Sequence, residues 1–176
     1  MNLGKPSQLQ FGTGSFTIAF WMKSPGVTSD PPVISNKNWV SGSNTGYVLA
    51  LKDDKSLLWN YKTAVGNRAD ARISSVADGK WHHIVVSHNR ATGRADFYKD
   101  GSPVTLTSVS GAPLYQGIAS SIDISARTGT IDSGLSTMIG NDGTGAYAEA
   151  PNFNLYIDDQ ERGYDCRCTG ASKSCG

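Results

Sequence analysis

Cysteine is absent from most of this 176-residue chain, because the three cysteines, Cys166, Cys168 and Cys175, all lie near the C-terminus. The residues before them can form no disulfide among themselves, so burial of apolar side chains must stabilise the body of the protein. Long apolar runs are also lacking, since no segment approaches the roughly 20 apolar residues that a membrane helix needs. The first residues do not show the basic and then apolar layout of a signal peptide. We therefore expect a soluble chain, with any export signal outside the given sequence.

An excess of charge of one sign is lacking as well. The chain has 16 Lys and Arg residues against 15 Asp and Glu residues, spread along its length, for a net charge of +1. This balance predicts neither a nucleic-acid surface nor an anionic-membrane surface.

A sustained helical period is missing, whereas glycine is abundant, with 20 residues. Turn-forming residues separate short apolar runs, which is typical of an all-β sandwich, and the length fits one domain. Strands are expected at residues 16–23, 32–35, 46–52, 57–62, 71–74, 104–107, 122–124, 137–140 and 154–158. Residues 108–121 are expected to form a surface excursion. Because apolar residues occupy both faces of the first strand, Trp21 is expected in the core.

The clearest local pattern is a β-hairpin over residues 78–101. Asp-Gly pairs stand at both outer ends, and two alternating runs flank a short polar turn. Alternation places His82 and His88 on one face of the first strand and His83 on the other. This arrangement favours structural roles for the histidines over catalytic or metal-binding ones.

The D-G-x-W-H-H strand and the Y-x-D-G strand of this hairpin resemble those of laminin-G-like, concanavalin A-like jelly rolls. Residues 11–23, 34–39 and 139–143 with 156–159 resemble further family blocks, in the family's order. The family occurs as accessory domains of secreted proteins and is related in fold to pentraxins and legume-type lectins. The resemblance implies an antiparallel two-sheet jelly roll over residues 1–159, a secreted or extracellular location and, most commonly, carbohydrate binding without catalysis.

Two family features are missing from the sequence. An F-D-G strand usually precedes the residues with which this chain starts, and an apolar strand usually follows the Ile-Asp-Asp at residues 157–159. We expect both terminal strands to be shortened. Flanking domains of a longer chain, or a second copy, are then expected to cover a free sheet edge.

The resemblance also implies calcium, as a structural or ligand-bridging ion. Calcium takes roughly six to eight oxygen ligands from carboxylates, amides, carbonyls and water. The candidate ligands are Asn36, Asn38, Asp142, Asp158 and Asp159. The alternative is that these residues form turns by bonding nearby backbone groups.

Carbohydrate is the expected ligand of the family resemblance. A pyranose ring stacks its C–H face on an aromatic ring, and its hydroxyls bond amides, carboxylates and guanidinium groups. The expected ligand-binding residues are Trp39, Tyr47, Trp59, Asn60, Tyr61, Arg68 and Arg72, with Tyr115 and Tyr147 as further aromatic candidates. Trp39 is the strongest choice, because it lies in a loop between Gly-containing turns. For each aromatic residue, packing is the alternative.

Two other classes of function stay open. A protein-interaction or adhesion domain would use the same surface or a free sheet edge. A polysaccharide-cleaving enzyme would need a carboxylate pair, and glycosidases on related jelly rolls use two glutamates close together on one strand. The only glutamates here are Glu149 and Glu161, on opposite sides of the last expected strand. We therefore expect no catalysis.

Residues 160–176 contain almost no aliphatic side chains and are expected to form a separate, polar tail. Its three cysteines lack the fourth ligand that a structural zinc site needs. One disulfide that closes a small loop, with one thiol left over, is the simpler expectation.

Overall fold

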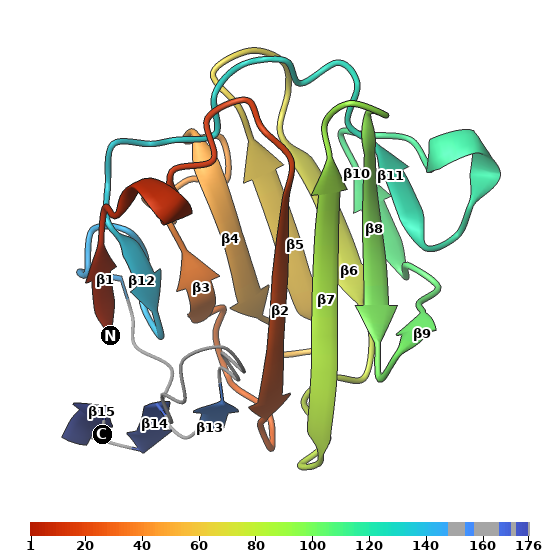
Figure 1. Ribbon diagram of the computed structural model, residues 1–176. Coiled ribbons are helices and arrows are strands. Elements are labelled where there is room, and N and C mark those ends of the chain that lie inside the picture. Colours follow the sequence, from red (N-terminus) through yellow and green to blue (C-terminus); the bar gives the residue numbers. More distant parts are fainter. Residues whose placement is uncertain (148–153, 157–165, 170–171, 176) are drawn as a thin grey trace.

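The computed structural model describes residues 1–147, 154–156, 166–169 and 172–175, with side chains up to residue 147. Its regular structure is almost entirely strands, which form two antiparallel sheets that face each other (Figure 1). The predicted all-β sandwich is confirmed. None of the helices in these ranges is long and apolar enough to cross a membrane.

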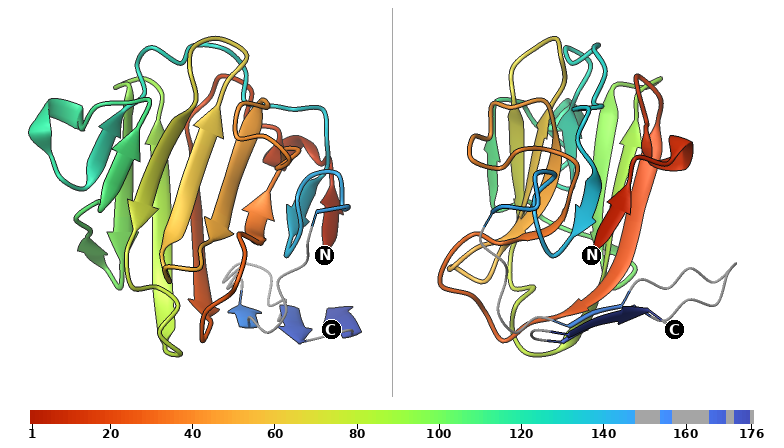
Figure 2. Two further views of the ribbon diagram at one scale, coloured as in Figure 1. Left: turned by 180° about the vertical axis from the view of Figure 1, so that it is seen from behind. Right: turned by 90° about the vertical axis from the view of Figure 1, so that its left-hand side faces the viewer.

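The first sheet has seven strands. In spatial order they are β1 (Asn2–Gly4), β12 (Thr137–Ile139), β3 (Pro32–Ser35), β4 (Gly46–Leu51), β5 (Leu57–Lys62), β6 (Ala69–Ile73) and β10 (Ser108–Ser110). The left-hand view of Figure 2 looks onto the outer face of this sheet, and the right-hand view shows the two layers edge-on.

The second sheet has six strands. In order they are β11 (Ser121–Asp123), β8 (Arg94–Lys99), β7 (Trp81–Asn89), β2 (Phe16–Lys23) and β13 (Asn154–Tyr156), with β9 (Ser102–Pro103) paired to β8. Two short 3-10 helices, η1 (Ser7–Leu9) and η2 (Tyr115–Gly117), lie in the connections. Near the C-terminus, β14 (Cys166–Thr169) and β15 (Ser172–Cys175) form a separate pair in whose register Cys166 lies opposite Cys175.

Strict alternation along β2 and β7 builds half of the core. Phe16, Ile18, Phe20 and Met22 are buried on β2, and the residues between them face outward. Trp21 belongs to the outward set and is 40% exposed, so the prediction that it lies in the core is wrong. Its indole lies 5.1 Å from the His83 ring, which occupies the same outer face of β7.

The central strands β4 and β5 are buried on both faces. Tyr47, Trp59 and Tyr61 point between the sheets, where their rings pack with centroid separations of 5.7 and 6.1 Å. These three rings are 1% exposed or less, so they are core residues rather than surface platforms for a ligand. On the outer face of the same strands, Val48, Ala50 and Leu58 form a second apolar cluster that a loop covers.

The hairpin formed by β7 and β8 is tied at its ends by His82. Its Nδ1 lies 2.8 Å from an Asp100 oxygen and its Nε2 lies 3.0 Å from an Asp78 oxygen. Asp100 also accepts a hydrogen bond from the His83 amide at 2.9 Å. The two Asp-Gly turns that punctuate the sequence are therefore joined through one buried imidazole.

Two predicted segments differ from the structure near the first sheet's edge. Residues 104–107 are not a strand, and the strand that pairs with β6 is β10, inside the expected surface excursion. In addition, β6 begins at Ala69 rather than at residue 71. Both differences matter because β6 and β10 carry the polar face described next.

Candidate functional site: a polar groove on the seven-stranded sheet

A groove of about 370 Å³ lies over the outer face of the seven-stranded sheet. Its lining residues come from β5, β6, β10 and the loops beside them: Asp30, Trp39, Lys52, Leu58, Arg68, Asp70, Arg72, Ser108 and Ser110. Of the residues predicted to bind the ligand, Trp39, Arg68 and Arg72 are brought together here.

Alternation along residues 68–72 creates the floor of this groove. Ala69 and Ala71 are buried between the sheets, so Asp70 and Arg72 face outward on β6, and Arg68, the residue just before the strand, continues the line. We call these three residues the β6 stripe.

Two cross-strand rows complete the floor. Asp70 lies between Asn60 on β5 and Ser110 on β10. Arg72 lies between Leu58 and Ser108 in the same way. Guanidinium donors, a carboxylate acceptor and two hydroxyls thus share one flat surface.

The Trp39 loop forms one wall of the groove. The indole is only 8% exposed, because it packs on Val48, Ala50 and Leu58. Its Nε1 donates to the Asp30 carbonyl at 3.1 Å, and its backbone N–H donates to Asp142 at 3.0 Å. Trp39 therefore offers an edge to the groove rather than an open ring face.

Every charged side chain that lines the groove has a partner of opposite sign. Arg68 Nε lies 3.0 Å from Asp70, and Lys52 Nζ lies 3.4 Å from Asp30. Arg72 Nη1 lies 2.6 Å from Asp54, which stands just outside the groove. A hydrogen bond from the Ser56 hydroxyl, with help from Arg72, lowers the pKa of Asp54 and keeps it ionised.

A fully buried lysine beside Asn60 supports the floor of the groove. Lys37 Nζ donates to Asn60 Oδ1 at 2.5 Å and to the Gly42 carbonyl at 3.0 Å. Asn60 Nδ2 in turn donates to Asp70 at 2.6 Å. Burial lowers the pKa of Lys37 to about 7, although Asp70 opposes this shift. The chain from Lys37 through Asn60 fixes the orientation of the Asp70 carboxylate.

Among the other predicted ligand residues, Asn60 lies on the outer face beside Asp70 but is fully buried. Tyr47, Trp59 and Tyr61 are in the core, on the opposite face of their strands. Tyr115 lies under Arg94, with 5.4 Å between the guanidinium carbon and the ring centroid. Tyr147 donates its hydroxyl to Asp30 at 2.8 Å, behind the groove wall.

The sequence did not predict six of the residues that line the groove: Asp30, Lys52, Leu58, Asp70, Ser108 and Ser110. The alternation Arg-Ala-Asp-Ala-Arg over residues 68–72 is the signal that adds Asp70 to the two arginines. For the serines, the pattern Ser-Val-Ser at 108–110 is too short to predict a strand by itself.

The described residues expected to hold calcium do not fit the ion. The side-chain oxygens of Asn36 and Asn38 accept backbone N–H groups from Tyr47 at 2.8 Å and Val40 at 3.0 Å. The two Asp142 oxygens accept backbone N–H groups from residues 39, 144 and 145. Up to residue 147, no group of three or more His, Cys, Asp or Glu side chains could hold a metal ion. Asp158 and Asp159 lie outside the described residues.

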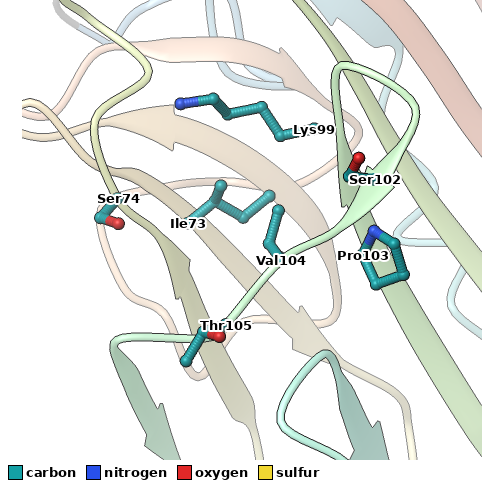
Figure 3. A pocket seen from close by; sticks show the side chains of 7 residues that line it. All are labelled: Ile73, Ser74, Lys99, Ser102, Pro103, Val104 and Thr105. Atoms are coloured by element: carbon teal, nitrogen blue, oxygen red, sulfur yellow. The ribbon is translucent and has the colours of Figure 1, made fainter.

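A second hollow, of about 260 Å³, lies between the end of β6 and the β8–β9 turn (Figure 3). Its wall combines Ile73 and Val104 with three hydroxyl side chains, from Ser74, Ser102 and Thr105. Its one cation, Lys99, already donates to the Ser75 carbonyl at 2.9 Å. This hollow is lined by one charged side chain, whereas five charged side chains line the groove.

Comparisons with known proteins agree with this architecture. A curated relative, the non-toxic nonhemagglutinin of Paraclostridium bifermentans, is 32% identical over 90 residues, which are 51% of this chain and 8% of that protein. The chain therefore spans a small part of the relative that it matches.

Two groups of solved structures share the fold. The CBM40 module of the Ruminococcus gnavus IT-sialidase, also solved with α2,3-sialyllactose bound, superposes with a TM-score of 0.52 at 15% identity, covering 87% of this chain and 80% of that one. Domains LG4–5 of the mouse laminin α1 chain superpose with a TM-score of 0.50 at 14% identity, covering 100% of this chain and 40% of that one.

The sequence profile of the concanavalin A-like lectin/glucanases superfamily matches residues 3–159. That match covers most of the chain, and the two antiparallel sheets agree with it. The resemblance seen in the sequence is confirmed: this chain is a laminin-G-like jelly roll that belongs to the concanavalin A-like lectin/glucanases superfamily.

Proposed function

We propose that this chain is a non-catalytic carbohydrate-recognition module and that its ligand binds in the groove over the seven-stranded sheet. The observation that carries the proposal is the β6 stripe, which aligns donors and acceptors beside two serine hydroxyls and an apolar wall. A saccharide presents alternating C–H surface and hydroxyls, which need this mixture. Membership of a superfamily that contains lectins, and a neighbour solved with sialyllactose bound, support the class of ligand.

A binding role suits the carboxylates of the groove better than a catalytic one. Asp30 and Asp70 each form an ion pair with a cation of the same surface. The carboxylate oxygens can therefore accept hydrogen bonds from sugar hydroxyls, while the paired cations donate hydrogen bonds to the same sugar. The two glutamates of the chain, Glu149 and Glu161, lie outside the described residues.

The wider setting of the module belongs to the same proposal. We propose that it works in a secreted or extracellular protein with flanking domains, as supported by the relative of which it matches 8%. Calcium enters the proposal only through Asp158 and Asp159, so binding in the groove itself is expected to survive a chelator.

The test replaces Arg72 by alanine and measures binding on a glycan array, followed by calorimetry on the best ligand. Arg72→Ala should weaken binding by about ten-fold, because it removes a guanidinium from the floor. Arg94→Ala is the matched control, since Arg94 is also a strand arginine, ion-paired to Asp96 at 2.6 Å and 32% exposed against 33% for Arg72. Equal losses in both variants, or no glycan bound by the wild type, would contradict the proposal.

A second candidate function is protein binding through the other sheet. Trp21 and Trp81, on the outer face of β2 and β7, are 40% and 39% exposed. Exposed aromatic surface of this kind is enriched at protein interfaces. Capture of a partner that survives deglycosylation, and that Arg72→Ala does not weaken, would favour this function.

A further inference from the structure

We infer that the groove selects an uncharged, hydroxyl-rich saccharide chain and discriminates against carboxylated or sulfated sugars. This inference rests on the proposed function and concerns the same groove. It names the class of ligand that the charges on its floor can accept.

The first argument is charge balance. Three cations and three carboxylates meet at the groove in one-to-one pairs: Arg68 with Asp70, Arg72 with Asp54, and Lys52 with Asp30. An anionic ligand is attracted by each cation but repelled by the carboxylate paired with it, so the two electrostatic contributions largely cancel. With each cation already neutralised at 3.4 Å or less, a sugar carboxylate finds no net attraction here.

The second argument is geometry. Arg68, just before β6, and Arg72, within it, are four residues apart in nearly extended chain, which places their Cα atoms about 13 Å apart. Asp70 lies between them on the same face. Each guanidinium is already held by its own carboxylate, and an anion between the two arginines would face Asp70.

The same ion pairs suit neutral hydroxyls. Arg68 uses Nε on Asp70, which leaves its terminal nitrogens to donate, while its side chain is 49% exposed. Hydroxyl groups both donate and accept, so a sugar can bond an arginine and a neighbouring carboxylate together. The length of the β6 stripe, with Ser108 and Ser110 beside it, fits a chain of sugars better than a single ring.

One further cation must be considered, because Lys37 is connected to Asp70 through Asn60. Its amine contacts Asn60 and the Gly42 carbonyl and is fully buried. Burial lowers the pKa of Lys37 to about 7. Measurements at a pH above about 8 therefore keep Lys37 largely neutral and isolate the three surface pairs.

The experiment compares matched neutral and acidic glycans with the wild-type chain: lactose against 3′-sialyllactose, and a galactan oligosaccharide against a galacturonan oligosaccharide. The neutral member of each pair should bind at least about five-fold more tightly, and its affinity should change less than about two-fold when salt rises from about 0.05 to about 0.3 M. Tighter binding of the acidic members would overturn the inference. Binding of no glycan at all would instead overturn the proposed function.

The variant Asp54→Asn tests the charge argument, because it should strengthen the binding of acidic glycans. The variant removes the partner of Arg72 but keeps the side-chain oxygen that accepts the Ser56 N–H and hydroxyl, so the turn should fold. Acidic glycans should then bind about five-fold more tightly than to the wild type, and the preference for neutral glycans should shrink.

Asp53→Asn is the matched control, because Asp53 is the adjacent exposed carboxylate and forms none of the ion pairs found up to residue 147. It should leave both classes of glycan unchanged. An equal gain in both variants would show a long-range charge effect and overturn the pairing argument. No gain in Asp54→Asn would overturn it as well.

Discussion

At the scale of single residues, His88 has the most unusual environment in the described chain. Its ring is 1% exposed, stacks on Phe16 at 4.8 Å and contacts Tyr61 at 4.3 Å. Neither ring nitrogen has a hydrogen-bond partner. Burial, with a smaller contribution from Arg90, lowers the pKa of His88 to about 3.

This environment predicts a loss of stability in mild acid. Below pH 6.5 the unfolded chain binds a proton at residue 88 that the folded chain excludes, so the free energy of unfolding falls as the pH falls toward 3. Between pH 7 and pH 5, this site should lower the free energy of unfolding by about 2 kcal/mol. His88→Phe should remove that loss in urea titrations at the two pH values, and His83→Phe, which leaves the buried ring in place, should keep it. An unchanged acid loss in His88→Phe would show that other groups cause it.

The same scale shows how far single residues could be predicted from the sequence. Alternation correctly separates His82 and His88 from His83. It cannot say which face of a strand is the core when both faces are apolar, and for this reason Trp21 was placed inside. Trp59 and Tyr61 were grouped with Asn60 as ligand residues although period two puts Asn60 on the other face.

At the scale of elements, the loop between β3 and β4 is held down by close backbone packing. Gly46 has φ of +122°, and a Cβ at this position would lie 2.5 Å from the Lys37 Cβ and 2.6 Å from Asn36 Oδ1. The adjacent Tyr47 amide donates to that same Asn36 oxygen. Only glycine lets the loop that carries Lys37 and Trp39 sit so closely on the sheet.

We expect Gly46→Ala to destabilise the protein by about 3 kcal/mol or more, because backbone strain and a steric clash add together. Gly101→Ala is the control: its φ is +78°, but nothing lies within 4 Å of the added Cβ. That variant should lower the free energy of unfolding by only about 1 kcal/mol, because it adds backbone strain without a clash. Chemical denaturation of the two variants checks the difference, and equal losses would mean that the clash is relieved at no cost.

Element boundaries also show why half of the groove was not predicted. Strands such as β3 and β5 were predicted with the observed limits, because turn residues flank long apolar patterns. In contrast, β10 has three residues and exists because it pairs with β6, far away in sequence. That long-range pairing places Ser108 and Ser110 beside the β6 stripe, and no local sequence pattern predicts it.

At the scale of the whole molecule, two buried bases act on stability in the same direction. His88, in the core, and Lys37, beside the groove floor, both have pKa values lowered by burial, to about 3 and about 7. Each binds its proton more weakly in the folded chain than in the unfolded one. Stability should therefore rise as the pH increases, first as the unfolded-state histidine loses its proton and then from pH 7 toward the ordinary lysine pKa of 10.5.

Two tyrosines, Tyr47 in the core and the partly buried Tyr147, set the upper limit of that rise. Burial raises the pKa of Tyr47 and Tyr147 to about 12, so above pH 10 the unfolded chain releases protons that the folded chain keeps, and stability falls. Maximum stability is thus expected at about pH 9 to 10, above the usual range of about 5 to 8. Lys37→Met should abolish the gain of about 2 kcal/mol between pH 7 and pH 9, whereas Lys80→Met, at an exposed position, should retain it. Urea midpoints across this range measure both variants, and a wild-type maximum near pH 7 would show that Lys37 stays charged in the folded protein.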